Sequence, residues 1–255
     1  TSERKLLWVQ IPFSALMYLI RTIFLVLTET VLFPFFFYQP LWLMKFLSKI
    51  FRDIIFYIPT KKNYFALTFD DGPNPYSTSK ILKILSRYNS KATFFVIGKQ
   101  VEKYPNVFKL TKSKGHQISN HFYDSWPSIL LTRKRLEASF LRNENLIRQK
   151  GYKFVRPSGA IFNSSLYDLA KKENFKIVLG SAYAMDWLNI PKRYIRWAIT
   201  NMLKPGVIVA LHDGRKNRQH TVDVLPYILK EARKRNLKAV TLNKLLESRR
   251  FIAFS

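Results

Sequence analysis

The chain has 255 residues, enough for one large α/β domain with a small appendage. It contains 43 lysines and arginines against 16 aspartates and glutamates, and this net charge of +27 favours anionic partners such as nucleic acid, acidic lipid or an anionic polymer. The absence of cysteine excludes disulfides, thiolate catalysis and a cysteine zinc site, so a metal or acid–base site that uses histidine must draw on the four present.

Residues 1–58 differ from the rest of the chain because apolar side chains dominate them. Two apolar runs, 6–20 and 23–38, are separated by Arg21, and neither alone reaches the roughly 18–20 residues that cross a bilayer. Joined into one span, they would place Arg21 near its middle, at a cost of roughly 2.5–3.5 kcal/mol. We interpret the segment as helical and membrane-associated. Three arrangements stay open, in which it spans the membrane, lies on its surface or does not touch it.

Residues 39–58 show an amphipathic helical pattern in which Lys45, Lys49 and Arg52 fall between aromatic and aliphatic residues. A helix of this composition suits a membrane interface. A core helix beneath the next domain is the alternative. We therefore expect membrane association through residues 1–58 and a place in the cell envelope, on a side of the membrane that the pattern does not reveal.

Short β-rich runs alternate with helical patterns over residues 59–255. The expected strands are 64–69, 92–97, 153–156, 176–179, 206–211 and 237–241. The expected helices are 77–88, 101–114, 131–149, 164–174, 191–203 and 220–235. This alternation predicts an α/β fold with a parallel sheet covered by helices. With about seven strands, we predict a distorted (β/α) barrel preceded by the apolar helical extension.

Polar residues cluster where these strands end, the edge at which α/β active sites lie. Asp70 and Asp71 follow the first strand and precede the turn Gly72-Pro73. Because side chains alternate along a strand, both carboxylates reach one site only where the chain bends, and this turn supplies a bend. Two close carboxylates repel unless a cation separates them or one is protonated. The pair is therefore either a metal ligand beside a base or a solvated turn.

Four further polar clusters follow along the chain. His121 precedes Asp124 and Ser125 at a spacing that lets an imidazole and an oxygen ligand meet one metal. The other three clusters are Arg156 to Gly159, Asp186-Trp187 and Leu211 to Asp213. Each cluster is a weak signal alone, because a single histidine or aspartate is more often structural. Their order along the chain carries more information than any one of them.

In that order the clusters resemble the five motifs of carbohydrate esterase family 4, the nodulation-type polysaccharide deacetylases, over residues 64–248. Thr68–Pro73 (TFDDGP) matches the first motif without a substitution. Two positions depart from the family pattern, because Ser125 stands where histidine is usual and Tyr183 where aspartate is usual. The resemblance implies a metal-dependent hydrolase that removes acetyl groups from N-acetylated or O-acetylated sugars of a polysaccharide.

The resemblance also implies a metal site. Asp71 and His121 would bind a divalent metal, zinc by preference, and Ser125 or a water would complete the ligand set. A neutral hydroxyl is a poor zinc ligand. Asp124 is therefore a second candidate for the third position.

The catalytic roles follow from the same resemblance. Asp70 is expected to be the general base and Arg156 to orient it, while His212 is the general acid whose pKa Asp186 raises. The residues implied for substrate binding, through an oxyanion contact and a small acetyl pocket, are Gly159, Trp187 and Leu211.

Two other functions stay open. Ser125 and Tyr183 are compatible with a catalytically impaired, carbohydrate-binding member of the same fold. A basic nucleic-acid-binding protein is the third possibility, but the sequence carries no nucleic-acid-binding motif, so we expect no nucleic acid as partner. We interpret the basic run Arg215, Lys216 and Arg218 as solvated surface.

Overall fold

The computed structural model describes residues 17, 21–22, 40–188, 190–214 and 218–249. The chain divides into two compact units, Thr1–Pro40 and Leu41–Ser255. The two predicted apolar runs before residue 39 lie almost entirely outside the described residues. Across the described part of the chain, no helix combines the length and apolar character needed to cross a bilayer.

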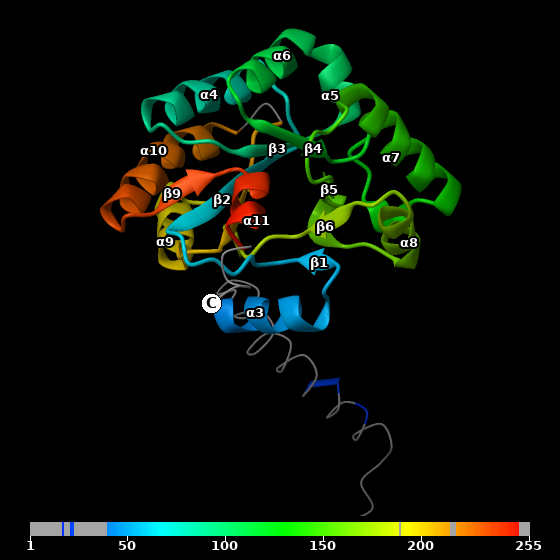
Figure 1. The fold of residues 1–255 in the computed structure, drawn as a ribbon, viewed down its shortest axis with the longest axis horizontal. Coiled ribbons are helices and arrows are strands. Elements are labelled where there is room, and N and C mark those ends of the chain that lie inside the picture. Colours follow the sequence, from blue (N-terminus) through cyan, green and yellow to red (C-terminus); the bar gives the residue numbers. More distant parts are fainter. Residues whose placement is uncertain (1–16, 18–20, 23–39, 189, 215–217, 250–255) are drawn as a thin grey trace, which may run out of the picture. The chain divides into compact units, whose positions relative to one another are not determined.

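Parallel strands form one curled sheet in the second unit (Figure 1). Their order is β1-β6-β5-β4-β3-β2-β8-β7, and β9 pairs with β2. The strands are β1 (Ile54–Ile55), β2 (Tyr64–Asp70), β3 (Thr93–Val96), β4 (Gln117–Asn120), β5 (Phe154–Val155), β6 (Lys176–Val178), β7 (Ala182–Tyr183), β8 (Ile208–His212) and β9 (Lys238–Val240). The predicted fold class, a distorted parallel barrel surrounded by helices, is confirmed, with more strands than expected.

Helices surround this sheet (Figure 1). They are α3 (Leu41–Ile50), α4 (Ser77–Arg87), α5 (Gly98–Lys103), α6 (Pro105–Ser113), α7 (Arg133–Ile147), α8 (Ser164–Lys172), α9 (Lys192–Met202), α10 (Gln219–Lys234) and α11 (Leu242–Ser248). The helix expected over 101–114 is two helices, because Pro105 lacks an N–H group and occupies the first turn of α6.

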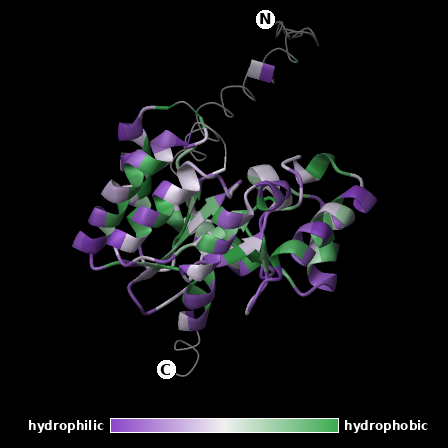
Figure 2. Cartoon of the chain, turned by 90° about the horizontal axis from the view of Figure 1, so that it is seen from above, coloured by the Kyte–Doolittle hydropathy of each residue, from purple (hydrophilic) through white to green (hydrophobic). Residues whose placement is uncertain are grey.

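The hydrophobic core lies between the sheet and its helices, and the central strands are mostly hydrophobic whereas the outer helices carry hydrophilic residues (Figure 2). Strand β2 is buried at every position after Tyr64, as expected of a parallel strand covered on both faces. Its register places Asp70 beside His212 of β8. Two of the polar clusters seen in the sequence therefore meet at one edge of the sheet.

Residues 41–58 pack with the sheet. Met44 of α3 is buried, β1 pairs with β6, and Ile58 is 2% exposed. The second compact unit therefore begins at Leu41, upstream of the boundary predicted after residue 58.

Candidate active site

The turn after β2 brings Asp70 and Asp71 to the same edge of the sheet. Asp71 has a φ of 74°, a left-handed conformation that non-glycine residues seldom adopt. The bend therefore begins at Asp71 itself, one residue before the predicted turn. The end of β8 must approach closely here, since a Cβ on Gly214 would lie 2.2 Å from the Asp71 carbonyl oxygen.

Asp70 is held by the buried guanidinium of Arg156. Arg156 Nη1 donates to Asp70 Oδ1 at 2.7 Å and to Thr68 Oγ1 at 2.8 Å, and Nε donates to the Val178 carbonyl at 3.1 Å. Both members of the pair are buried, at 5% and 2% exposure. A carboxylate that is paired and oriented in this way suits a general base.

One ring nitrogen of His121 is fixed by a hydrogen bond, and the other faces Asp71. Its Nδ1 lies 2.7 Å from the Arg156 carbonyl oxygen, which can only accept, so Nδ1 carries the hydrogen. Nε2 lies 3.6 Å from Asp71 Oδ1. Burial by itself lowers the pKa of His121, but Asp71 and Asp70 more than offset this and raise it. Asp71 and Asp70 therefore stabilise a positive charge on the His121 ring.

Asp71 and His121 fit two ligands of one divalent metal. Two ligands bonded at roughly 2.0–2.2 Å to a tetrahedral ion lie about 3.3–3.5 Å apart, close to the 3.6 Å separation of the two side chains. A backbone carbonyl on the second ring nitrogen is the usual partner of a metal-binding histidine. Within the residues that the structure describes, however, no cluster of three or more His, Cys, Asp or Glu side chains could hold a metal.

The candidates for a third ligand lie at the surface. Ser125 is exposed. Asp124 forms an ion pair with Lys99. Its neighbour Tyr123 is tied down as well, because its hydroxyl donates to Glu102 Oε2 at 2.7 Å. The role of Ser125 or Asp124 as a ligand therefore stays a prediction.

His212 faces Asp186 in the arrangement expected of a general acid. Asp186 Oδ1 lies 2.8 Å from His212 Nδ1, and Oδ2 accepts from the His212 backbone N–H at 2.8 Å and from Thr221 Oγ1 at 2.6 Å. Burial opposes a charged imidazole, but the charge of Asp186 and its hydrogen bond dominate and raise the pKa of His212 to about 9. His212 is therefore an imidazolium at neutral pH, with Nε2 as its available donor.

The residues expected to bind substrate differ in exposure. Trp187 is 40% exposed and its ring meets the His212 ring edge-on at 4.9 Å. Gly159 is exposed with a φ of 74°, which leaves its backbone open to approach. Leu211 is fully buried in the core, so it contacts an acetyl methyl group only where the cleft reaches that depth.

Two buried residues next to the site were not assigned by the sequence. Arg218, interpreted as solvated surface, is 5% exposed and donates to Asp71 Oδ2 at 3.3 Å, so that interpretation was wrong. Burial raises the pKa of Asp71, but His121, His212 and Arg218 together hold it well below its usual range. Nothing in the sequence of this basic run indicates that one of its side chains, that of Arg218, is buried.

Asp213 is the second of these residues. It is fully buried, and burial raises its pKa to about 7 although Thr78 donates to its Oδ2 at 2.5 Å. A Cβ on Gly72 would lie 2.5 Å from both Asp213 carboxyl oxygens, so this carboxyl group fits against the turn that carries Asp71. Its carboxyl group lies against this turn and Thr78 in the structure.

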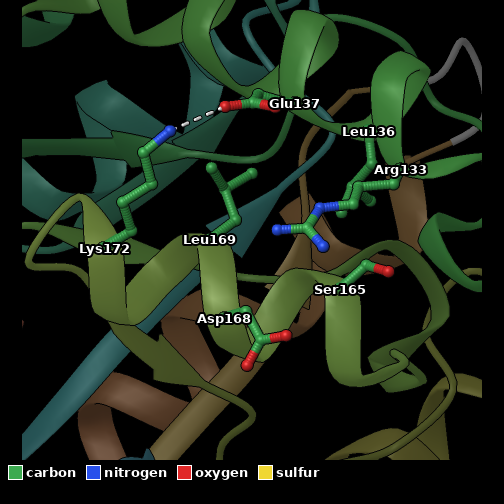
Figure 3. A pocket seen from close by; sticks show the side chains of 7 residues that line it. All are labelled: Arg133, Leu136, Glu137, Ser165, Asp168, Leu169 and Lys172. Atoms are coloured by element: carbon green, nitrogen blue, oxygen red, sulfur yellow. Dashed lines mark hydrogen bonds and ion pairs between the residues drawn. The ribbon is translucent and has the colours of Figure 1, made fainter.

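A separate hollow lies between α7 and α8, away from the strand ends (Figure 3). Its volume is about 60 Å³, far below the few hundred Å³ that a sugar ring needs. Charged side chains line it, including the ion pair between Lys172 and Glu137 at 3.1 Å. None of the candidate catalytic residues lines this hollow.

Comparisons with known proteins point to one family. A family model described as polysaccharide deacetylase matches residues 57–178, a span that contains Asp70, Asp71, His121 and Arg156. A peptidoglycan-N-acetylglucosamine deacetylase of Bacillus cereus is 33% identical over 193 residues, which cover 74% of this chain and 91% of that protein.

Solved structures agree as well. The peptidoglycan N-acetylglucosamine deacetylase Bc1960 superposes with a TM-score of 0.73 at 32% identity, covering 78% of this chain and 96% of that one. A family 4 acetyl xylan esterase from Clostridium thermocellum, solved with a cobalt ion, superposes with a TM-score of 0.65 at 27% identity, covering 72% and 90%.

Proposed function

The chain belongs to the polysaccharide deacetylase family, metal-dependent hydrolases that remove acetyl groups from sugars, and on this premise we propose that it deacetylates N-acetylglucosamine residues of peptidoglycan. One observation carries the proposal most directly. A carboxylate fixed by arginine (Asp70) and an imidazolium fixed by a carboxylate (His212) sit at paired positions of β2 and β8. Hydrolysis of an amide needs such a base and such an acid on one substrate.

Each side chain has a definite task in this reaction. Asp71 and His121 would hold a divalent metal, which supplies an activated water and polarises the acyl carbonyl. Asp70 takes the proton of the attacking water while Arg156 keeps it oriented. The backbone N–H at Gly159 donates to the oxygen that becomes negative. His212 gives its proton to the leaving nitrogen, which releases acetate and a free amino sugar.

We propose zinc as the metal. An imidazole nitrogen and a carboxylate oxygen are ligands that zinc accepts readily, and open positions beside them suit a catalytic zinc that binds water and substrate. Cobalt and other divalent ions with the same ligand preferences are the alternatives. Metal analysis of the purified chain, with acetate release after reloading by each ion, distinguishes them.

The proposal is tested by acetate release from a panel of substrates in the presence of zinc. Peptidoglycan, N-acetylated chito-oligosaccharides and acetylated xylan separate N-deacetylation from O-deacetylation. We expect His212→Asn to lower turnover by about 10²–10⁴, the usual contribution of general acid catalysis. His220→Gln, on α10 and outside the proposed machinery, is the matched control. A wild-type chain that binds metal and glycan but releases no acetate would instead identify an impaired, carbohydrate-binding member of the family.

We also propose that residues 1–58 associate with a membrane and place the enzyme in the cell envelope. The support is the apolar sequence before residue 39 and the surface of α3, where Trp42, Phe46 and Ile50 are 62%, 53% and 55% exposed at helical spacing. Flotation of the full chain with anionic vesicles tests this. Phe46→Ser should weaken vesicle binding, whereas Leu110→Ser, at an apolar site on α6 that is 41% exposed, should not.

A further inference from the structure

Arg218 is buried immediately before α10, beside the turn that carries Asp71. Its side chain is 6% exposed, and Nη2 donates to Asp71 Oδ2 at 3.3 Å. Its Nε is buried without a hydrogen-bond partner in the described part of the chain. A guanidinium is costly to hold away from water unless a carboxylate compensates its charge. The carboxylate that compensates the charge of Arg218 is therefore that of Asp71.

The two oxygens of Asp71 face different groups. Oδ1 lies 3.6 Å from His121 Nε2, and Oδ2 is the atom that Arg218 contacts. His121 in turn is fixed through Nδ1 by the Arg156 carbonyl oxygen. Each candidate metal ligand is therefore held by a group that is not itself a ligand. The terminal torsion of an aspartate is soft, so a carboxylate without such a contact would rotate.

We propose that Arg218 is a positioning residue of the metal site, holding Oδ2 of Asp71 so that Oδ1 alone faces the metal position shared with His121. The inference rests on the proposed function, because it requires Asp71 and His121 to be the ligands. Arginine suits the task better than lysine, since its planar guanidinium meets a carboxylate oxygen in a defined direction.

The charge of Arg218 and its geometry have opposite effects on a metal. A positive guanidinium next to a divalent ion repels it, so if charge were its only effect, removal of Arg218 would tighten metal binding. Loss of the contact to Oδ2 frees the carboxylate and should weaken binding, by about 10–100-fold for a partner of a metal ligand. The direction of the change therefore separates the two effects.

The experiment measures zinc affinity of the full chain by competition with a chelating dye. We expect Arg218→Gln and Arg218→Lys each to weaken zinc binding by about 10–100-fold. The visible absorption of the cobalt-loaded variants should also change, because Asp71 no longer presents one fixed oxygen. Arg235→Gln is the control. Arg235 lies at the opposite end of α10 and its Nε donates to Glu231 Oε1 at 3.0 Å.

Three results would decide against the inference. Unchanged or tighter zinc binding in Arg218→Gln, with the fold retained by circular dichroism, would overturn it. If that variant does not fold, Arg218→Lys keeps the charge beside Asp71, and an affinity and cobalt spectrum like the wild type would overturn it equally. A wild-type chain that binds neither zinc nor cobalt would defeat the proposed metal site and this inference together, whereas the first two results leave the proposed function standing.

Discussion

Replacing Asp186 with asparagine should move the alkaline limit of activity to lower pH. The pKa of His212 is about 9 against an ordinary value of 6.5, and this difference corresponds to about 3 kcal/mol of net stabilisation of the imidazolium. Burial opposes the charge and Asp186 supplies most of the compensation. In Asp186→Asn the burial remains and only Asp70 and Asp71 still oppose it, so the pKa of His212 should fall from about 9 towards its ordinary value of 6.5. Asparagine can also donate to Nδ1 and favour the neutral ring.

The assay is kcat/KM for acetate release from pH 5 to 10. The wild type should lose activity as the pH rises through about 9, because His212 then becomes neutral. Asp186→Asn should already lose activity as the pH rises through about 6.5, and should be down about tenfold at pH 7.5. Asp223→Asn, a surface carboxylate on α10 paired with Lys192, is the control. If the alkaline limit of a folded Asp186→Asn stays near 9, His212 is not the acid or Asp186 does not set its pKa.

The His212–Asp186 pair should also make the stability of the fold depend on pH. Because the pKa of His212 is raised in the folded protein, its contribution to stability is fully present below pH 6.5 and is lost as the pH rises through about 9. Thermal melting of the metal-free chain across this range should show that decline in the wild type. The decline should be absent in Asp186→Asn.

Three further predictions concern the metal ligands and the start of the domain. Asp71→Asn should lose bound metal and activity together, whereas Asp70→Asn should keep the metal and lose about 10²–10⁴ of turnover; metal analysis beside acetate release checks both. Ser125→His should tighten zinc binding if Ser125 faces the site, and equal titration curves would show that it points elsewhere. A chain that starts at Leu41 should keep the melting temperature of the full chain. A chain that starts at Lys61 loses β1 and two buried isoleucines, whose burial contributes roughly 3–6 kcal/mol to stability. Equal denaturation midpoints for the two truncated chains would contradict this.

The long periodic elements were predictable because local pattern and tertiary burial agree. Strand β2 is apolar on both faces and runs straight into Asp70, so its sequence indicates both the strand and the edge where chemistry lies. The helices from α4 to α10 keep an apolar face at helical spacing. The predicted helices and the structure differ at their ends and in the division of the helix expected over 101–114 into α5 and α6.

Strand β4 could not be predicted from pattern, because its sequence, Gln117 to Asn120, is mostly polar. The side chains of Gln117 and Asn120 find hydrogen-bond partners far away in the sequence, whereas the buried Ser119 hydroxyl has none among the described residues. Asn120 Nδ2 donates to the Phe140 carbonyl at 3.1 Å, and its Oδ1 accepts from Asn143 at 2.9 Å. Burial of polar groups depends on such partners, which lie about twenty residues away in the sequence. β1 and β7 are too short, at two residues each, for any alternation to appear.

The candidate site was recognisable where a motif fixes residue type and spacing, as in Asp70 and Asp71, and less so where a contact depends on the fold. Arg218 belongs to a basic run that resembles ordinary surface, and only the approach of α10 to the β2 turn buries it. The third metal ligand stays a prediction for the same reason. The sequence spacing allows Asp124, but Lys99 on a neighbouring helix pairs with it.

The cleft has a charge balance that explains why these contacts occur together. Each ionised carboxylate has its own cationic partner, in the pairs Asp70–Arg156, Asp186–His212 and Asp71–Arg218. Because the six groups are largely withdrawn from water, each charge must be compensated locally, and loss of one partner costs more than loss of the pair. A divalent ion held by Asp71 and His121 would add positive charge to this site. Amide hydrolysis passes through an anionic transition state, which such a charge would stabilise more than it stabilises the neutral substrate.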